Sequence, residues 1–324
     1  MSRRSERHEN GTSIRALVEA EITRPQPAAV IAAAQHATAP HGDAVDALLY
    51  YGSCLRTGVL ADRILDFYVL VADYDSAYDR RWLALANRLL PPNVFYDEME
   101  YADPPRLRSK VNVISTDDFS RRVRADCVNV SIWARFAQPV ALVQVRDADM
   151  RARIVDAIAE AIGTTLDAAR PLASAGDDAA ALWSRAFDLT YGAELRSEPP
   201  GKGREIYEAD AARYDRLFAA WCRETGIATR SDRDGRLRLA ESPPASERRR
   251  ALRAWRRRRW NGKVVSLLRL VKAAFTFSGG IDYLAWKIRR HSGVEITLSA
   301  WQRRHPLLAG LLLFLRLKRR GAFR

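Results

Sequence analysis

The sequence has little of what builds disulfide-linked, zinc-binding or membrane-spanning proteins. Its 324 residues include three widely spaced cysteines and five scattered histidines, which make neither a disulfide framework nor a zinc-binding pattern. The longest apolar run covers residues 307–315 and is well short of the ~20 residues that a spanning helix needs. The N-terminal residues mix charges and no apolar run follows them, so we expect no secretory signal and a cytoplasmic protein.

Apolar residues make up 48% of the chain, which is enough to bury a sizeable core and excludes disordered, collagen-like and coiled-coil chains. The charge is divided unevenly along the sequence. Residues 248–324 hold 21 lysines and arginines against two acids, a net charge of +19, whereas the first 247 residues carry a net charge of −5. So basic a C-terminal segment predicts an anionic partner, either nucleic acid or the headgroups of an anionic bilayer.

Strand-like and helix-like segments alternate through the first half of the chain. Strands are predicted at residues 47–51, 65–71, 111–114 and 140–145. Helices are predicted over residues 13–38, interrupted by Pro25 and Pro27, over residues 81–90, and over residues 150–162 with Gly163 as a stop. Residues 179–226 are mainly helical with a break near Pro199, and the polar residues 232–246 are the expected linker. We therefore expect an α/β fold with a mixed sheet, then a smaller helical domain, then a basic amphipathic segment.

The most informative stretch is Gly52-Ser53, which follows a predicted strand, together with Asp66 in the next strand. A Gly-Ser turn exposes backbone N–H groups and a hydroxyl, which suit phosphate oxygens. An acid in the neighbouring strand can hold a divalent ion over those phosphates. This spacing resembles the signature of the nucleotidyltransferase superfold, in which a metal-bridged triphosphate is attacked at its α-phosphorus and pyrophosphate leaves.

An ordinary turn beside a solvated strand edge would give the same pattern, and Tyr68 stands where a second acid is usual. Three further motifs favour the nucleotidyltransferase interpretation. The sequence resembles the mitochondrial-type phosphatidate cytidylyltransferase family, the translocator-maintenance proteins and their bacterial relatives, which also lack that second acid. The segments that carry the resemblance, in the family's order, are residues 51–54 (YGSC), 64–67 (ILDF), 110–116 (KVNVIST), 134–140 (ARFAQPV) and 190–196 (TYGAELR).

The resemblance implies a nucleotidyltransferase-type mixed sheet and a set of site residues. Asp66 and Glu194 would hold Mg²⁺, and Gly52 and Ser53 would cradle the triphosphate of CTP. The phosphate charges would be neutralised by basic residues, which are Lys110, Arg135, Arg196 and Lys202. We count Asp66, Glu194 and Lys110 as catalytic. The acceptor phosphate is already largely ionised at neutral pH, so no general base is needed.

Three departures limit what is carried over from the family. Cys54 replaces the second glycine of YGSG, Gln138 replaces a lysine, and Glu194 stands where the family has Asp. Glu194 keeps the charge with a longer reach, while the loss of a lysine at position 138 removes one phosphate contact. Without the resemblance, Lys110 and Arg135 fit solvated strand ends as well, and Glu194 with Arg196 fits a surface pair.

The basic C-terminal segment is typical of a helix lying in the headgroup plane of a membrane. Val264, Leu267, Leu268, Val271 and Phe275 share one helical face, with Arg269 and Lys272 off that face. Four of the eight tryptophans lie in this segment, and residues 306–324 form an apolar stretch ending in bases. Alternatively, residues 275–298 pack back on the body as core, which would leave only residues 248–259 exposed.

These observations predict a peripheral membrane enzyme that transfers CMP from CTP to phosphatidate, with Mg²⁺ as cofactor. We place a nucleotidyltransferase domain at residues 1–163 and a helical domain that completes the active site at 164–245. Residues 246–324 would bind the anionic inner face of the membrane. The alternatives are a nucleotidyltransferase acting on RNA or another phosphorylated acceptor, and an inactive membrane adaptor. We do not expect nucleic acid as a partner, because the tail lacks aromatics interleaved for base stacking and residues 307–317 are too apolar for an RNA clamp.

Overall fold

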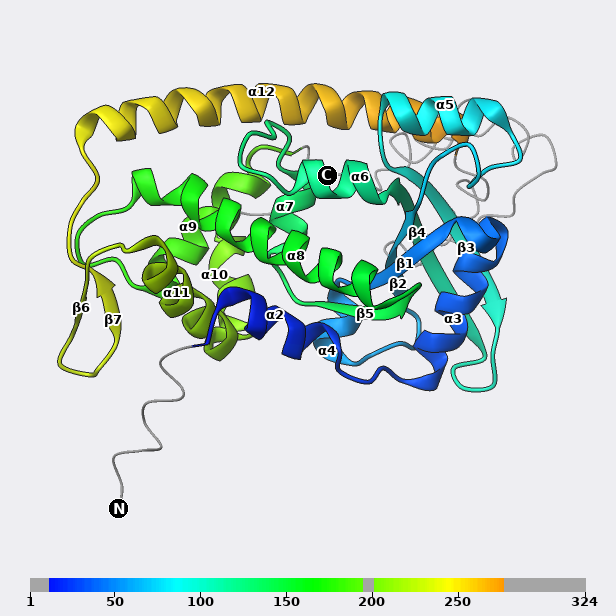
Figure 1. Cartoon of the computed structure of the whole chain (residues 1–324), viewed down its shortest axis with the longest axis horizontal. Helices are drawn as coiled ribbons and strands as arrows, with labels where there is room; N and C mark the ends of the chain where they lie inside the picture. The colour runs from blue at the N-terminus through cyan, green and yellow to red at the C-terminus, as the bar shows by residue number, and fades with distance from the viewer. Residues whose placement is uncertain (1–11, 195–200, 277–324) are drawn as a thin grey trace, which may run out of the picture.

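A computed structural model of the chain describes residues 12–194 and 201–276 (Figure 1). Five strands form one mixed sheet in the order β3–β4–β2–β1–β5, in which β2 and β4 are parallel and the other neighbours antiparallel. The strands are β1 (Val45–Tyr51), β2 (Ile64–Val71), β3 (Asn93–Glu100), β4 (Arg106–Ser115) and β5 (Val140–Val145). The expected α/β fold with a mixed sheet followed by a helical region is confirmed, and this arrangement is consistent with the nucleotidyltransferase type.

The two faces of the sheet are covered by different helices, because alternate side chains of each strand point to opposite faces. Phe67 and Val69 of β2 pack toward α3 (Ala28–Thr38), whose buried alanines allow a close approach to the strands. Tyr68 and Leu70 point to the opposite face and join a larger core. The connecting elements on the first side are η1 (Ala39–Ala44), α4 (Ser53–Thr57) and α5 (Arg81–Leu89).

The larger core is one continuous cluster that extends from Ile14 to Trp255. It unites the second face of the sheet with helices from both halves of the chain. These are α2 (Ile14–Ile22), α6 (Thr116–Arg122), α7 (Ser131–Phe136), α8 (Ala148–Ala169), α9 (Ala179–Tyr191), α10 (Lys202–Glu208) and α11 (Ala211–Thr225), with the short η2 (Arg170–Leu172) after α8. The helices between residues 164 and 245 therefore share a core with the sheet.

Aspartates at the N-caps define where the long helices begin. The carboxylate of Asp147 accepts the backbone N–H of Met150 at 2.7 Å, and Asp178 and Asp210 cap α9 and α11 in the same way. The expected stop at Gly163 is wrong, since α8 continues to Ala169. A glycine inside a helix costs about 1 kcal/mol relative to alanine, and the buried Leu166 continues the apolar spacing beyond it.

Two segments differ from the sequence-based expectations. Strand β3 was not predicted, although Phe95 and Tyr96 have high strand propensity. The expected linker contains part of a small hairpin, β6 (Thr229–Ser231) with β7 (Leu237–Leu239). Asp232 closes this hairpin by accepting the backbone N–H groups of Asp234 and Arg236 at 2.9 Å each.

Helix α12 (Ala245–Thr276) runs along one side of the molecule, at the top of Figure 1. Trp255 anchors it in the core: the side chain is 2% exposed, its Nε1 donates to Ala168 O at 3.0 Å, and its ring meets that of Trp133 edge to face. Trp260, by contrast, is 70% exposed. Of the tail tryptophans assigned to the membrane surface, Trp255 is therefore a core residue, and Trp286 and Trp301 lie outside the described residues. Among the helices that the structure describes, none has the length and apolar content needed to cross a bilayer.

Candidate functional site

The turn after β1 places Gly52 directly beside Asp66. Tyr51 and Asp66 are partners in the antiparallel pair of β1 and β2, so the residue after Tyr51 lies next to the Asp66 side chain. Gly52 has φ +92°, and a Cβ built on it would lie 2.6 Å from Asp66 Oδ2. Only glycine combines this backbone conformation with the missing side chain. The predicted proximity of the Gly-Ser turn and the strand acid is present in the fold.

The residues next to Gly52 differ in exposure. Ser53 begins α4 and is exposed, while Cys54 is buried and its Sγ lies 3.1 Å from Ile64 O. Cys54 therefore fills space beneath the turn, as a small buried residue.

Gln138, which stands where the family has a lysine, lies near an arginine. It donates from Nε2 to Ala134 O at 3.3 Å, and its Oε1 lies 3.5 Å from Arg56 Nη1. Arg56 thus brings a cation beside the position where the family has a lysine.

Lys110 lies beside Asp66 because β2 and β4 are parallel and in register at these two residues. Lys110 Nζ is 3.9 Å from Asp66 Oδ1, and both side chains are partly exposed, at 35% and 25%. An ammonium and a carboxylate on adjacent strands, facing solvent, can contact a phosphate and its metal from the same side. The structure places this predicted pair together.

Arg135 of α7 approaches the same corner from the helical side. Its guanidinium carbon is 5.0 Å from the centroid of the Tyr51 ring, a cation–π distance. Burial acts to lower the pKa of Arg135, but Tyr51 and nearby carboxylates outweigh it, and the pKa is raised. The carboxylates that contribute are Glu194 and Asp66. Arg135 therefore stays a cation, and both acids predicted to bind metal act on it.

Tyr68, the residue that replaces the second acid, is buried among these charges. Its ring packs edge to face on Phe136, and it is 3% exposed. Burial raises the pKa of Tyr68; Arg135 and Arg269 act to lower it, and Glu194 and Asp66 act to raise it. The electrostatic neighbourhood of this one phenol contains both predicted metal ligands and two arginines.

Glu194 belongs to the turn that follows α9. Its backbone N–H donates to Tyr191 O at 3.2 Å. Helix α12 packs against this turn at Gly262, where a Cβ would lie 2.0 Å from Ala193 O. The close contact of two backbones fixes the position from which the Glu194 side chain starts.

The remaining predicted residues are distributed differently. Arg196 lies outside the described residues. Lys202 begins α10, and its Nζ forms an ion pair with Glu205 on the same helix. Sequence reasoning missed Arg269 and Lys272, which α12 turns toward the body of the protein. In the sequence, the position of these two residues off the apolar face of the helix was the only indication that they contact the protein.

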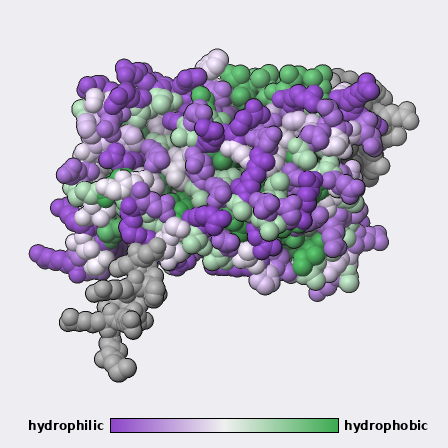
Figure 2. Space-filling view, viewed as in Figure 1, coloured by the Kyte–Doolittle hydropathy of each residue, from purple (hydrophilic) through white to green (hydrophobic). Residues whose placement is uncertain are grey.

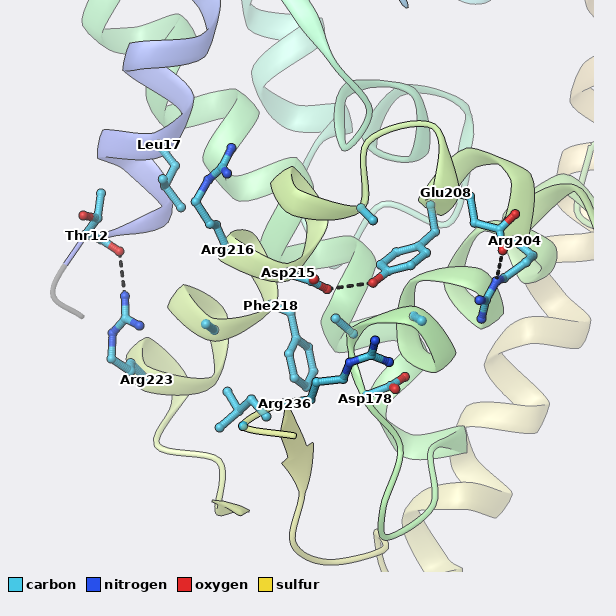
Figure 3. Close-up of a pocket in the computed structure, with 17 residues that line it drawn as sticks. Thr12, Leu17, Asp178, Arg204, Glu208, Asp215, Arg216, Phe218, Arg223 and Arg236 are labelled. Atoms are coloured by element: carbon cyan, nitrogen blue, oxygen red, sulfur yellow. Dashed lines mark hydrogen bonds and ion pairs between the residues drawn. The ribbon is translucent and has the colours of Figure 1, made fainter. Parts of the chain in front are cut away.

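A cavity of about 950 Å³ lies between α2, α9, α10, α11 and the hairpin (Figure 3). Its walls are rich in charge, but several of these charges pair within the wall. Arg204 Nε donates to Glu208 at 2.6 Å, Tyr207 donates to Asp215 at 2.8 Å, and Arg223 donates to Thr12 O at 2.7 Å. None of the predicted site residues lines this cavity, which is separate from the Asp66 corner.

Within residues 12–194 and 201–276, no cluster of three or more His, Cys, Asp and Glu side chains has the arrangement of a metal site. Asp66 and Glu194 both act electrostatically on Tyr68 and Arg135. The sequence matches no family model and no curated protein. The arrangement of two acids, Lys110, Arg135 and a glycine turn provides charges of both signs around a partly exposed corner of the sheet, which suits a phosphorylated ligand with a divalent ion.

Proposed function

We propose that this chain is a nucleotidyltransferase that transfers CMP from CTP to phosphatidate at a membrane surface. The observation that carries the proposal is the contact of Gly52 with the Asp66 carboxylate, with Lys110 in register on the next strand. Gly52, Ser53 and Lys110 would bind the triphosphate there. The motifs that resemble the phosphatidate cytidylyltransferase family supply the choice of CTP and phosphatidate.

The reaction joins two polyanions, so charge repulsion is its main barrier and fixed cations are its main requirement. A phosphate oxygen of the acceptor attacks the α-phosphorus of CTP, a new P–O bond forms, and the bond to the β-phosphate breaks to release pyrophosphate. Lys110 and Arg135 offset the negative charge on the two reactants. The acceptor oxygen is already ionised, so the reaction needs no general base.

The donor set around Asp66 fits Mg²⁺. This ion commonly takes one or two protein carboxylates and fills its other positions with phosphate oxygens and water. Asp66 and Glu194 would hold it, and the partly exposed Asp66 carboxylate is accessible to a nucleotide-bound ion. When bound, the ion supplies positive charge to the triphosphate and the leaving pyrophosphate.

Association with a membrane is supported by an exposed apolar surface on α12 and α5. Trp260, Leu267, Leu268 and Val271 of α12 are each about half exposed or more, and hydrophobic side chains gather along this helix in Figure 2. Helix α5 adds Trp82, Leu85 and Leu89, which share a face at helical spacing. The two helices are adjacent, because Arg269 and Lys272 of α12 bond the backbone directly after α5.

The arginines of the first half of α12 complete this surface. Seven of them are exposed: Arg248, Arg249, Arg250, Arg253, Arg256, Arg257 and Arg259. Each base near an anionic leaflet contributes about 1 kcal/mol. An apolar stripe beside such a basic stretch is the pattern of a helix that lies in the headgroup plane.

Pyrophosphate release from the purified chain tests the proposal. The assay contains Mg²⁺, one of the four NTPs, and phosphatidate in anionic liposomes. We expect release only with CTP and phosphatidate together, and its loss in Asp66→Asn with folding intact. Asp62→Asn is the matched control, since the Asp62 side chain is 91% exposed. Wild-type turnover by Asp66→Asn would contradict the assignment of the site. CTP turnover with another lipid would mean that the acceptor is not phosphatidate, and RNA-dependent release would favour the nucleotidyltransferase that acts on RNA. No pyrophosphate release under any condition would favour the inactive membrane adaptor.

A further inference from the structure

The inner face of α12 buries the guanidinium of Arg269, whose hydrogen bonds within the described residues all go to neutral acceptors. Arg269 Nη1 donates to Ser131 Oγ at 3.0 Å, while Nε and Nη2 donate to Pro91 O at 3.2 and 2.7 Å. These acceptors are neutral, and in the described part of the chain Arg269 forms no ion pair. A buried cation whose hydrogen bonds go only to neutral groups is costly, so this arrangement favours binding of an anion.

Two more arginines extend this buried charge. Arg135 lies one helical turn after Ser131 on α7, so Arg269 docks beside the helix face that carries it. The Nε atoms of Arg135 and of Arg122 are buried and have no hydrogen-bond partner among the described residues. The contact of Arg122 with an acid is long, 4.0 Å from Nε to Asp118 Oδ1. The Arg122 side chain is 26% exposed, but a buried Nε–H without a partner, in either arginine, is suited to a phosphate oxygen.

The electrostatics at Arg269 and Lys272 agree with a surplus of positive charge on the inner face of α12, whereas nearby carboxylates raise the pKa of Arg135. Burial lowers the pKa of Arg269, and Arg122 and Arg135 lower it further, against the opposing effects of Tyr68 and Glu194. On the next turn of α12, burial together with Arg269 and Arg122 lowers the pKa of Lys272 to about 7. Cations that lower one another's pKa occupy a positive potential, which a bound anion would relieve.

We propose that Arg122, Arg135 and Arg269 form a subsite for the phosphate monoester of the acceptor lipid. This inference rests on the proposed function and assigns the second substrate to the α12 side, opposite Gly52 and Lys110. The position of α12 indicates that this subsite binds the lipid and not the nucleotide. Leu267 and Leu268 point outward just before the inward-facing Arg269, and a helix is about 10 Å across. A phosphate held by Arg269 therefore lies within reach of a lipid whose acyl chains stay in the bilayer.

The experiment compares the apparent KM values for the two substrates in the full chain. The mole fraction of phosphatidate in the liposomes is varied, and phosphatidylglycerol replaces it so that the total anionic charge stays constant. We expect Arg269→Gln and Arg122→Gln to raise the KM for phosphatidate about tenfold or more, while the KM for CTP changes less than about twofold. Arg269→Lys, which keeps the charge but loses the planar fork, should recover part of the effect. Arg153→Gln on α8, which breaks an ion pair with Asp117 of α6, is the control.

A binding measurement separates this inference from the proposed function. Calorimetry in the absence of nucleotide measures the binding of dihexanoyl phosphatidate, a soluble lipid, to the wild type and to each variant. Loss of that binding in Arg269→Gln supports the subsite even if CTP is never turned over. Equal binding by the wild type and both Gln variants, or a rise in the KM for CTP alone, overturns it. Should Arg269→Gln unfold, Arg122→Gln carries the test, because the ion pair of Arg122 with Asp118 is long, 4.0 Å, and contributes little to folding.

Discussion

Gly52 and Asp66 are in direct contact across the β1–β2 pair, with room for a hydrogen but not for a methyl group between them. The contact depends on two properties of one residue: its positive φ and its missing side chain. Asp66 is thereby held against backbone on one side and faces Lys110 on the other. A carboxylate confined in this way has few rotamers left, which favours a fixed position for the ion and phosphates it is proposed to bind.

Gly52→Ala is expected to abolish most activity. The new Cβ would lie 2.6 Å from Asp66 Oδ2 and must displace the carboxylate, and a misplacement of this size lowers turnover by about 100-fold. The backbone strain costs a further 1–3 kcal/mol, roughly, in the free energy of unfolding. Pyrophosphate release and urea unfolding measure the two effects.

Gly58→Ala separates strain from contact. Gly58 ends α4 with φ +69°, but a Cβ there meets nothing within 4 Å. We expect a similar loss of stability and nearly normal activity. Equal inactivation of both variants would show that strain alone, and not the position of Asp66, explains the effect.

Gly262→Ala is expected to disturb the site from the far side. Its Cβ would lie 2.0 Å from Ala193 O, so either α12 or the turn that carries Glu194 must move. We expect a loss of about 1–3 kcal/mol in the free energy of unfolding together with reduced turnover. Gly163→Ala is the control within a helix: it meets nothing within 4 Å and should stabilise by about 0.5–1 kcal/mol. Normal turnover in Gly262→Ala would contradict a role of α12 in positioning Glu194.

The double variant Leu267→Glu/Leu268→Glu is expected to weaken liposome binding. Both side chains are half exposed, so the fold should tolerate the change, whereas two carboxylates would oppose both the apolar and the electrostatic attraction to an anionic leaflet. Liposome flotation measures binding, and the melting temperature checks folding. Ile31→Glu on α3, another exposed apolar position, should float like the wild type. Equal flotation of all three proteins would refute the assignment of α12 to the membrane.

His41 is expected to destabilise the protein in mild acid. It is 8% exposed, its Nδ1 lies 2.8 Å from Ala77 O, and burial lowers its pKa below 6.5. The unfolded chain therefore binds a proton at a higher pH than the folded chain does. The stabilisation is fully present above pH 6.5 and is lost as the pH falls below that value. In His41→Asn the free energy of unfolding should fall less between pH 7 and pH 5, roughly the range in which an imidazole titrates.

His36 on the neighbouring helix provides the comparison for that titration. Its side chain is 48% exposed and pairs with Asp97. The slope of unfolding free energy against pH should change in His41→Asn in the direction of greater acid stability, and His36→Asn controls for the loss of an imidazole at an exposed position. A wild-type slope in His41→Asn would mean that another group controls the acid response.

The strands around Asp66 could be predicted because each is a short run of β-branched and aromatic residues bounded by turn residues. The pairing of Asp66 with Lys110 needed more than propensity, since it depends on the parallel register of β2 and β4. The conserved order of the motifs in the resembling family indicated that both residues belong to one site, and the register brings them together.

The contribution of α12 to the site could not be predicted in the same way. Val264, Leu267, Leu268 and Val271 do share an exposed face, as their spacing indicates. Whether the opposite face contacts solvent or protein depends on long-range packing, here of Gly262 on Ala193 and of Arg269 on Ser131. A helical wheel cannot show such contacts. Strand β3 was missed for a related reason: its acidic residues suit an edge position, which becomes evident only from the order of the sheet.

The burial of Trp255 against Trp133 also determines when the core can complete its packing during synthesis of the chain. The sheet face that holds Tyr68 and Leu70 shares its core with residues as far along the chain as Trp255. A ribosome-bound chain that ends before this tryptophan leaves the indole of Trp133 without its aromatic neighbour. Nascent chains with unfinished apolar surfaces are prone to aggregation. The sheet can therefore complete its packing only after most of the polypeptide has left the exit tunnel.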